Sequence, residues 1–356
     1  MLESFGFLSM QFEESEKRDF RPDFFGKIAD LPVSILLDDL YGAKLNFTKQ
    51  DYLNRNANIK FCPRGEVLKA DCIVTIRTPD FSQLSQLKRG AIFFSMLHYL
   101  TRKNRNQFLL NNGVKMLAMD SVVDDFGNRI LQDFPGTAEN AFIAIYRECE
   151  KFIKEKEIIK VLILGHGEIG KICVEKAIKL VYKPVIVTVA GRSVTSQKII
   201  LNKLLSESDI LVDATKRDNP SKYIISNDQI NLLPIDAVIL DISADDYDVQ
   251  INPIQVKGIE GIPTGNLDKY IFYPDDIAYD NLPKQVSSRY RRLILSCNAW
   301  PGLNPKRCLD RYEIQLEPLI RIIAKNGYNF ALDSVDPYER ALARSTYNYY
   351  LSSLKQ

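Results

Sequence analysis

The sequence predicts an α/β protein built from two parallel β-sheets, each covered by helices on both faces. Short apolar runs of strand length alternate with helix-like segments along almost all of the 356 residues. The runs are continuously apolar, which is typical of parallel strands buried on both faces. A chain of this length is expected to form two domains.

Five apolar runs predict the strands of the first domain, and a helix-like segment at 101–111 follows the fourth of them. The runs lie at residues 5–8, 33–37, 72–76, 91–96 and 114–119. Apolar residues then recur at the spacing of one buried helical face, at Ala141, Ile145, Cys149 and Phe152. We expect a connecting helix at 137–157, with Thr137 as its N-cap.

A second α/β series follows, with helices expected after residue 167, at 196–205 and near residue 228. Its predicted strands lie at residues 158–164, 185–189, 210–212 and 237–242. Two helices end the chain, at 309–325 and 338–354, and Asp336-Pro337 is typical of an N-cap followed by proline in the first turn. Two helices cannot form a domain alone, so we expect them to pack on the first domain.

The second series contains a motif typical of dinucleotide binding, Gly165-His166-Gly167-Glu168-Ile169-Gly170, between an apolar strand and a helix. Gly165 would make the tight turn, Gly167 would let the backbone approach the pyrophosphate, and Gly170 would let the helix pack close to the strand. Amides at the helix start would face the phosphate charge. The residues expected to bind the cofactor here are Gly165, Gly167, Glu168, Ile169 and Gly170. The alternative is a tight turn without a ligand.

The sequence therefore predicts two Rossmann-like doubly wound domains with a cleft between them. The first, substrate-binding domain comprises 1–136 and 290–356. The dinucleotide-binding domain, 158–289, is inserted in it.

The end of the next predicted strand favours NADP(H) over NAD(H). Dinucleotide-binding folds that take NAD carry an acidic residue about 20 positions after the glycine loop, where it binds the ribose. Here Arg192 and Ser193 follow that strand, and both are suited to a 2′-phosphate. NAD(H) remains an alternative, because Arg192 would also be consistent with a solvated loop charge.

Four residues at predicted strand ends are candidates for the chemistry. The chain has only two histidines, and the other lies in the glycine loop, so acid–base work by imidazole would fall to His98. Arg18 and Arg77 are suited to grip a substrate carboxylate in bidentate fashion. Asp245 is suited to orient a substrate amine or exchange protons with it. The alternatives are that the histidine is packed in the core, that the two arginines are surface charges and that the aspartate lies in an exposed turn.

The order of these motifs resembles the alanine dehydrogenase superfamily, which includes lysine-forming saccharopine dehydrogenases and N5-(carboxyethyl)ornithine synthases. The resemblance covers nearly the whole chain. Besides the glycine loop, it rests on Glu16-Lys17-Arg18 with Pro22, Arg77-Thr78-Pro79, Ser95-Met96-Leu97-His98 and Leu240-Asp241-Ile242-Ser243-Ala244-Asp245. Asp280-Asn281-Leu282-Pro283 is similar to a stretch of saccharopine dehydrogenases.

The resemblance implies a role for three of these residues. Arg18 would bind the substrate carboxylate, His98 would be an acid–base group in contact with the substrate, and Asp245 would close over the substrate and nicotinamide. The chain departs from the family at Arg77, where lysine is usual, and arginine cannot act as a general base. After Asp245, Asp246 stands where alanine dehydrogenases carry glycine, so the substrate is not transferable.

We therefore expect an NAD(P)H-dependent oxidoreductase that condenses a 2-oxo acid with an amino acid and reduces the imine, as in saccharopine formation. One alternative is an alanine dehydrogenase-like enzyme acting on a primary amino acid and ammonia. A second is a non-catalytic NADP(H)-binding sensor. A third is an oxidoreductase acting on a hydroxyl group.

Composition narrows the expected partners to small molecules. Lys and Arg number 47 against 45 Asp and Glu, a net charge of +2, which predicts neither nucleic acid nor an anionic membrane as partner. No apolar run reaches the about 18 residues that span a bilayer, and the N-terminus lacks a secretory signal. Six cysteines without C-x-x-C or zinc spacing predict reduced thiols, no metal and a cytoplasmic location. A homo-oligomer is expected only by analogy with relatives.

Overall fold

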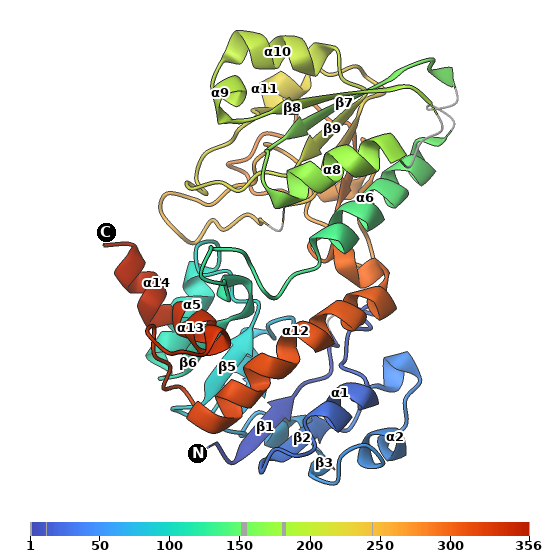
Figure 1. The fold of residues 1–356 in the computed structure, drawn as a ribbon. Coiled ribbons are helices and arrows are strands. Elements are labelled where there is room, and N and C mark those ends of the chain that lie inside the picture. Colours follow the sequence, from blue (N-terminus) through green and yellow to red (C-terminus); the bar gives the residue numbers. More distant parts are fainter. Residues whose placement is uncertain (1, 12, 151–154, 180–182, 244, 356) are drawn as a thin grey trace. The chain divides into compact units, whose positions relative to one another are not determined.

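The computed structural model describes residues 2–11, 13–150, 155–179, 183–243 and 245–355. The chain divides into two compact units, one of Met1–Asp133 with Pro305–Gln356 and one of Phe134–Asn304. Within the described residues each unit contains one six-stranded sheet (Figure 1). The predicted pair of Rossmann-like sheets is confirmed. Phe152 of the predicted helical face and Ala244 of the aspartate motif lie outside the described residues.

The sheet of the first unit has the strand order β3-β2-β1-β4-β5-β6, and all its pairings are parallel. Its strands are β1 (Ser4–Phe7), β2 (Ser34–Asp38), β3 (Ile59–Cys62), β4 (Cys72–Val74), β5 (Ile92–Ser95) and β6 (Lys115–Ala118). The order reverses between β1 and β4, so loops at the carboxyl ends of these two strands flank a switch point, where such sheets bind ligands. The sequence analysis missed β3, because only Ile59 of this edge strand is fully buried and no apolar run marks it.

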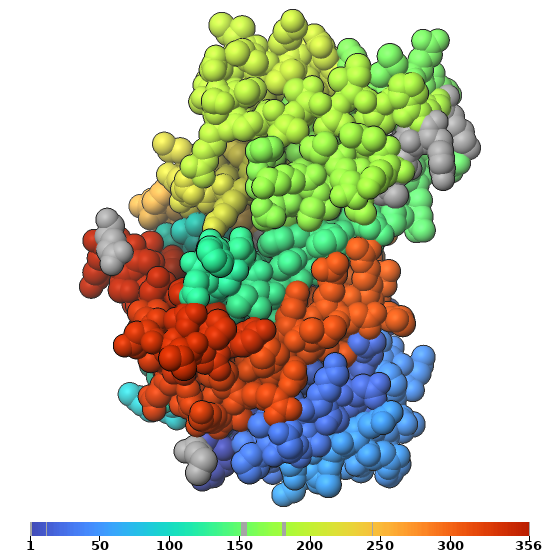
Figure 2. Space-filling model, in the orientation of Figure 1, coloured from blue at the N-terminus to red at the C-terminus, as the bar shows by residue number. Residues whose placement is uncertain are grey.

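Helices cover both faces of this sheet. They are α1 (Pro22–Lys27), α2 (Lys49–Leu53), α3 (Arg64–Val67), α4 (Phe81–Leu84), α5 (Lys103–Asn111), α12 (Pro305–Asn326), α13 (Pro337–Arg344) and α14 (Tyr347–Ser353), with 3₁₀ turns η1 (Ala43–Leu45) and η2 (Met119–Ser121). Figure 2 shows the C-terminal helices, from orange to red, on one side of this unit.

The predicted helix at 338–354 is wrong, because the structure has two helices there. Thr346 interrupts the pattern: its side chain accepts a hydrogen bond from the amide of Tyr349 and so caps α14. The carbonyl of Ser345 accepts a hydrogen bond from the amide of Ala118 in β6, so the backbone here bonds to the sheet instead of continuing the helix. The predicted N-cap at Asp336 is confirmed by bonds from Tyr338 N and Glu339 N.

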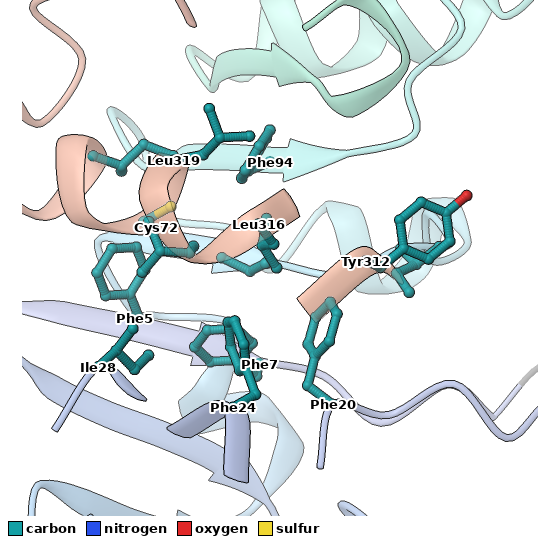
Figure 3. Packing of buried hydrophobic residues seen from close by; sticks show 14 of the residues in the cluster. Phe5, Phe7, Phe20, Phe24, Ile28, Cys72, Phe94, Tyr312, Leu316 and Leu319 are labelled. Atoms are coloured by element: carbon teal, nitrogen blue, oxygen red, sulfur yellow. The ribbon is translucent and has the colours of Figure 1, made fainter. Parts of the chain in front are cut away.

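The core of the first unit lies between α12 and the sheet. In this cluster Leu316 of α12 lies beside Phe7 of β1, and Leu319 lies beside Phe94 of β5 (Figure 3). Phe7 meets Phe25 edge to face with centroids 5.0 Å apart. Burying each such side chain contributes about 1.5–3 kcal/mol. The two final helices of the sequence analysis are therefore part of the first unit's fold.

The sheet of the second unit has the order β11-β12-β10-β9-β7-β8 and is parallel except for β11 against β12. Its strands are β7 (Ile159–Leu164), β8 (Val185–Ala190), β9 (Ile210–Asp213), β10 (Val238–Asp241), β11 (Ile271–Phe272) and β12 (Leu293–Ser296). The chain crosses from β8 over β7 to β9, so the switch point lies between β7 and β9.

Helices also cover both faces of the second sheet. They are α6 (Phe134–Glu148), α8 (Glu168–Lys179), α9 (Arg192–Thr195), α10 (Lys198–Ser206) and α11 (Asn227–Ile230), with η3 (Ile277–Tyr279) and η4 (Trp300–Leu303). Helix α6, predicted as a connector, buries Ala141, Phe142 and Ile145 in this unit's core and starts before the predicted cap. The unit extends beyond the predicted residue 289 to Asn304, because β12 pairs with β10.

Among the described residues, no helix combines the length and the hydropathy needed to span a bilayer. The same residues contain no group of three or more metal-ligating side chains.

Candidate functional site: the glycine loop and the strand ends

The glycine loop connects β7 to α8 at the switch point of the second sheet. Gly165 has φ +98°, and a Cβ there would lie 2.6 Å from the carbonyl oxygen of Ala214. A Cβ on Gly170 would lie 2.3 Å from the carbonyl oxygen of Gly165. Because both obstacles are backbone atoms, glycine is required at these two positions.

Gly167 is different, because a Cβ there would meet nothing within 4 Å. The exposed side of the loop therefore allows a ligand to approach the backbone. Helix α8 begins at Glu168, and the amides of its first turn have no partner within the helix. The side chain of Glu168 points away to Lys171, at 3.2 Å. Open backbone beside unpaired helical amides fits a dinucleotide pyrophosphate.

Arg192 and Ser193 begin α9, directly after β8. Arg192 Nη1 lies 2.7 Å from Asp218 Oδ2, and the two side chains are 78% and 72% exposed. The residues that follow β8 in the sequence include no carboxylate, because the partner Asp218 belongs to the loop after β9. An exposed pair of this kind contributes about 0–1 kcal/mol, so a phosphate can compete for the arginine.

Arg18 and Arg77 lie at the carboxyl ends of β1 and β4, on the two sides of the first sheet's switch point. Arg18 is buried and binds Glu16 in bidentate fashion, with Nε–Oε1 at 2.8 Å and Nη2–Oε2 at 2.6 Å. Arg77 Nη1 pairs with Glu13 and lies 3.6 Å from Glu16 Oε2. Glu16 thus stands between the two predicted arginines.

The two glutamates change the electrostatics of this cluster. Burial would raise the pKa of Glu16, but Arg18 and Arg77 lower it below its usual value. Burial would lower the pKa of Arg18, and Glu16 raises it well above the usual value. The cluster is therefore two fixed ion pairs, which hold the guanidinium planes in place. The sequence alone did not reveal the role of Glu13. Its partner Arg77 lies more than 60 residues away along the chain, and no local pattern links the two.

His98 follows β5 with φ +47° and is held by Asp120 of η2. Its amide donates to Asp120 Oδ1 at 3.0 Å, and its Nδ1 lies 3.5 Å from Asp120 Oδ2. Burial lowers the pKa of His98, Asp120 opposes this, and Arg129 lowers it further, so the pKa lies below its usual value. The imidazole is therefore neutral at neutral pH. With Nδ1 facing Asp120, Nε2 is the atom suited to exchange a proton.

Arg129 belongs to the same region and was missed by the sequence analysis, because it lies in no motif. Its Nη2 is 3.0 Å from Met96 Sδ, beside the strand that leads to His98. Its charge lowers the pKa of His98 and opposes the burial that raises the pKa of Tyr312, a ring also influenced by Arg18. The first unit therefore brings Arg18, Arg77 and His98 together at neighbouring strand ends.

Asp245 lies in the second unit, in the loop after β10. Its Oδ2 is 2.6 Å from Arg217 Nη2, and its side chain is 21% exposed. Asp241, which ends β10, is fully buried, and its Oδ2 lies 2.8 Å from Lys257 Nζ. Asp246 accepts from Thr264 Oγ1 at 2.9 Å. Asp245 and Asp246, for which an exposed turn was the alternative interpretation, are therefore bound into a polar network.

Comparison with known proteins supports this organisation. Residues 14–135 match the family model "Alanine dehydrogenase/PNT, N-terminal domain". An L-alanine dehydrogenase structure, 14% identical, matches 96% of this chain and 94% of its own with a TM-score of 0.66. A transhydrogenase from Sinorhizobium meliloti, 12% identical, matches 90% of this chain and 95% of its own with a TM-score of 0.60. No curated protein sequence matches the chain.

The family match covers most of the first unit and includes Arg18, Arg77 and His98. The two structural matches extend the common fold over nearly the whole chain. The family model therefore supports the resemblance to the alanine dehydrogenase superfamily over residues 14–135, and the two structures show that the fold is shared over most of the chain.

Proposed function

We propose that the protein is an NAD(P)(H)-dependent oxidoreductase that reductively condenses a 2-oxo acid with an amino acid, with NADP(H) as the preferred cofactor. The observation that carries the proposal is that Arg18 and Arg77, after β1 and β4, both contact Glu16, while His98 follows the neighbouring strand β5. Guanidinium groups and a neutral imidazole are suited to a 2-oxo acid. The family match over residues 14–135 and the open glycine loop support the nicotinamide cofactor.

In the proposed reaction Arg18 and Arg77 hold the carboxylate of the oxo acid. The amine of the second substrate adds to the keto carbon and loses water to give an imine. When bound, the reduced cofactor supplies the hydride for the imine carbon. His98 Nε2 accepts a proton from the adding amine and returns one as water leaves, and solvent supplies the further proton that the nitrogen takes up when the imine is reduced. Asp245 orients the amine nitrogen by its negative charge.

The secondary-amine product is preferred for two reasons. Arg192 and Ser193 after β8 favour NADP(H), and Asp280 to Pro283 resemble a stretch of saccharopine dehydrogenases. In the alternative, ammonia replaces the amino acid. Pyruvate or 2-oxoglutarate is therefore assayed with lysine, ornithine or ammonia, and NADPH oxidation is followed by absorbance. Faster turnover with ammonia than with either amino acid would reject the condensation.

The role of His98 is tested by His98→Ala in the same assay. General acid–base groups contribute about 10²–10⁴-fold, so we expect a loss of that size in kcat. Arg321→Ala is the control, because Arg321 of α12 bonds Asp30, Glu317 and the carbonyl of Lys27, none of which is a predicted site residue. Near wild-type turnover by His98→Ala would refute the proton role. A wild-type protein that binds NADPH but turns over no substrate pair would be a sensor.

A further inference from the structure

The loop that carries Asp245 is held by two buried cations, Arg217 and Lys257. Arg217 Nη2 contacts the carboxylate at 2.6 Å, and the arginine side chain is only 6% exposed. Lys257, 1% exposed, donates from Nζ to the backbone carbonyl of Asp245 at 2.7 Å. One cation thus holds the side chain of Asp245 and the other holds its main chain.

Arg217 is itself immobilised by backbone carbonyls. Nη1 donates to the carbonyl of Lys222 at 2.8 Å, and Nη2 donates to that of Val256 as well as to Asp245. A guanidinium is planar with its donors in a fixed fork, so these bonds determine where Nη2 meets the carboxylate. Among the described residues Arg217 Nε has no hydrogen-bond partner.

Lys257 ties the same loop to the end of the strand. Its Nζ lies 2.8 Å from Asp241 Oδ2, and that oxygen also accepts Ser296 Oγ of β12 at 2.9 Å. The next residue, Gly258, packs so closely that a Cβ would lie 2.4 Å from Asp213 Oδ2 at the end of β9. Lys257 therefore links the main chain of Asp245 to Asp241 at the end of β10, which Ser296 in turn links to β12.

We propose that Arg217 and Lys257 are positioning residues that hold the Asp245 carboxylate in its working orientation. This inference rests on the proposed function, in which Asp245 orients the amine. Oδ2 is occupied by Arg217, while the side chain remains one-fifth exposed, so the carboxylate presents one oxygen to an amine. Misplacing a reacting group by about 1 Å can cost 10²-fold in rate. Losing the arginine fork should therefore lower kcat without disturbing the glycine loop.

Arg217→Lys is the test, because it keeps the charge and removes the fork. Arg292→Lys is the matched control in the same unit. Arg292 is also buried, and its three nitrogens donate to the carbonyls of Pro234, Leu233 and Arg291, but it meets no carboxylate of the site. We expect kcat to fall about 10–100-fold for Arg217→Lys and to stay within twofold for Arg292→Lys. The Kd for NADPH, measured by fluorescence, should stay within twofold in both.

A double variant separates positioning from general support of the fold. If Arg217 acts through Asp245, Arg217→Lys should change kcat no further in an Asp245→Asn background. A further loss there, or equal losses for Arg217→Lys and Arg292→Lys, would overturn the inference. An active wild type with a fully active Arg217→Lys variant would refute it while sparing the proposed function. A wild type that binds NADPH without turnover would refute both.

Discussion

Two glycines of the same loop should respond to alanine in opposite ways. In Gly170→Ala the new Cβ would lie 2.3 Å from the carbonyl oxygen of Gly165, so the turn must open. Overpacking of this kind costs about 1–3 kcal/mol. For a unit of this length about 2–4 °C of Tm is lost per kcal/mol.

In Gly167→Ala the methyl meets nothing within 4 Å, and the backbone lies outside the left-handed region. The substitution should leave the fold intact, or stabilise it by about 0.4–1 kcal/mol through the unfolded chain. The methyl would stand where the pyrophosphate is expected. A clash of about 1–3 kcal/mol would weaken NADPH binding about 5–150-fold.

The assay pairs thermal unfolding with fluorescence titration of NADPH. Gly170→Ala should lower Tm, and Gly167→Ala should raise the Kd at unchanged or higher Tm. Gly65→Ala in α3 of the first unit is the control, since its Cβ would make only an ordinary contact, 3.6 Å from Gln86. Unchanged NADPH affinity in Gly167→Ala, with wild-type Tm in Gly170→Ala, would refute this account of the loop.

Two more predictions concern charged side chains of the second unit. Arg192→Ala should raise the KM for NADPH about 10–100-fold, because a charged hydrogen bond is lost, and leave the KM for NADH unchanged. Equal changes in the two KM values would reject the 2′-phosphate role. Burial and the neighbouring charge of Asp241 raise the pKa of Asp213 to about 6, although Thr215 and Arg217 act to lower it. The native state thus keeps a proton that the unfolded chain releases above its pKa of 3.8, and stability falls as pH rises towards about 6. Asp213→Asn should therefore gain about 2 kcal/mol relative to wild type between pH 4.5 and pH 7 in urea unfolding, and parallel pH profiles would contradict this.

The elements that could be predicted are those whose causes are local. The glycine loop can be recognised from six consecutive residues, because a Cβ on Gly170 would meet the carbonyl of Gly165 in the same turn, although the obstacle to a Cβ on Gly165 is the distant Ala214. Continuous apolar runs marked most of the central strands, since these are buried on both faces, but β12 was missed. Strand β3 was missed because only one of its four residues is buried. The pattern at 338–354 did not reveal the break at which Ser345 bonds to β6.

The candidate site was predicted only in part for the same reason. Sequence motifs named Arg18, Arg77, His98 and Asp245, but not what each side chain contacts. Glu13, Asp120, Arg217 and Lys257 approach them from 12 to 64 residues away. These contacts depend on the order of the strands in each sheet, which no local sequence pattern encodes.

By itself the sequence determined the α/β class and the loop suited to a dinucleotide, because sterics and apolar periodicity act over a few residues. Only the tertiary structure decided that Glu16 stands between Arg18 and Arg77 and that Arg217 holds Asp245. Both arrangements depend on which strands become neighbours in a sheet, and no local pattern of residues fixes that order.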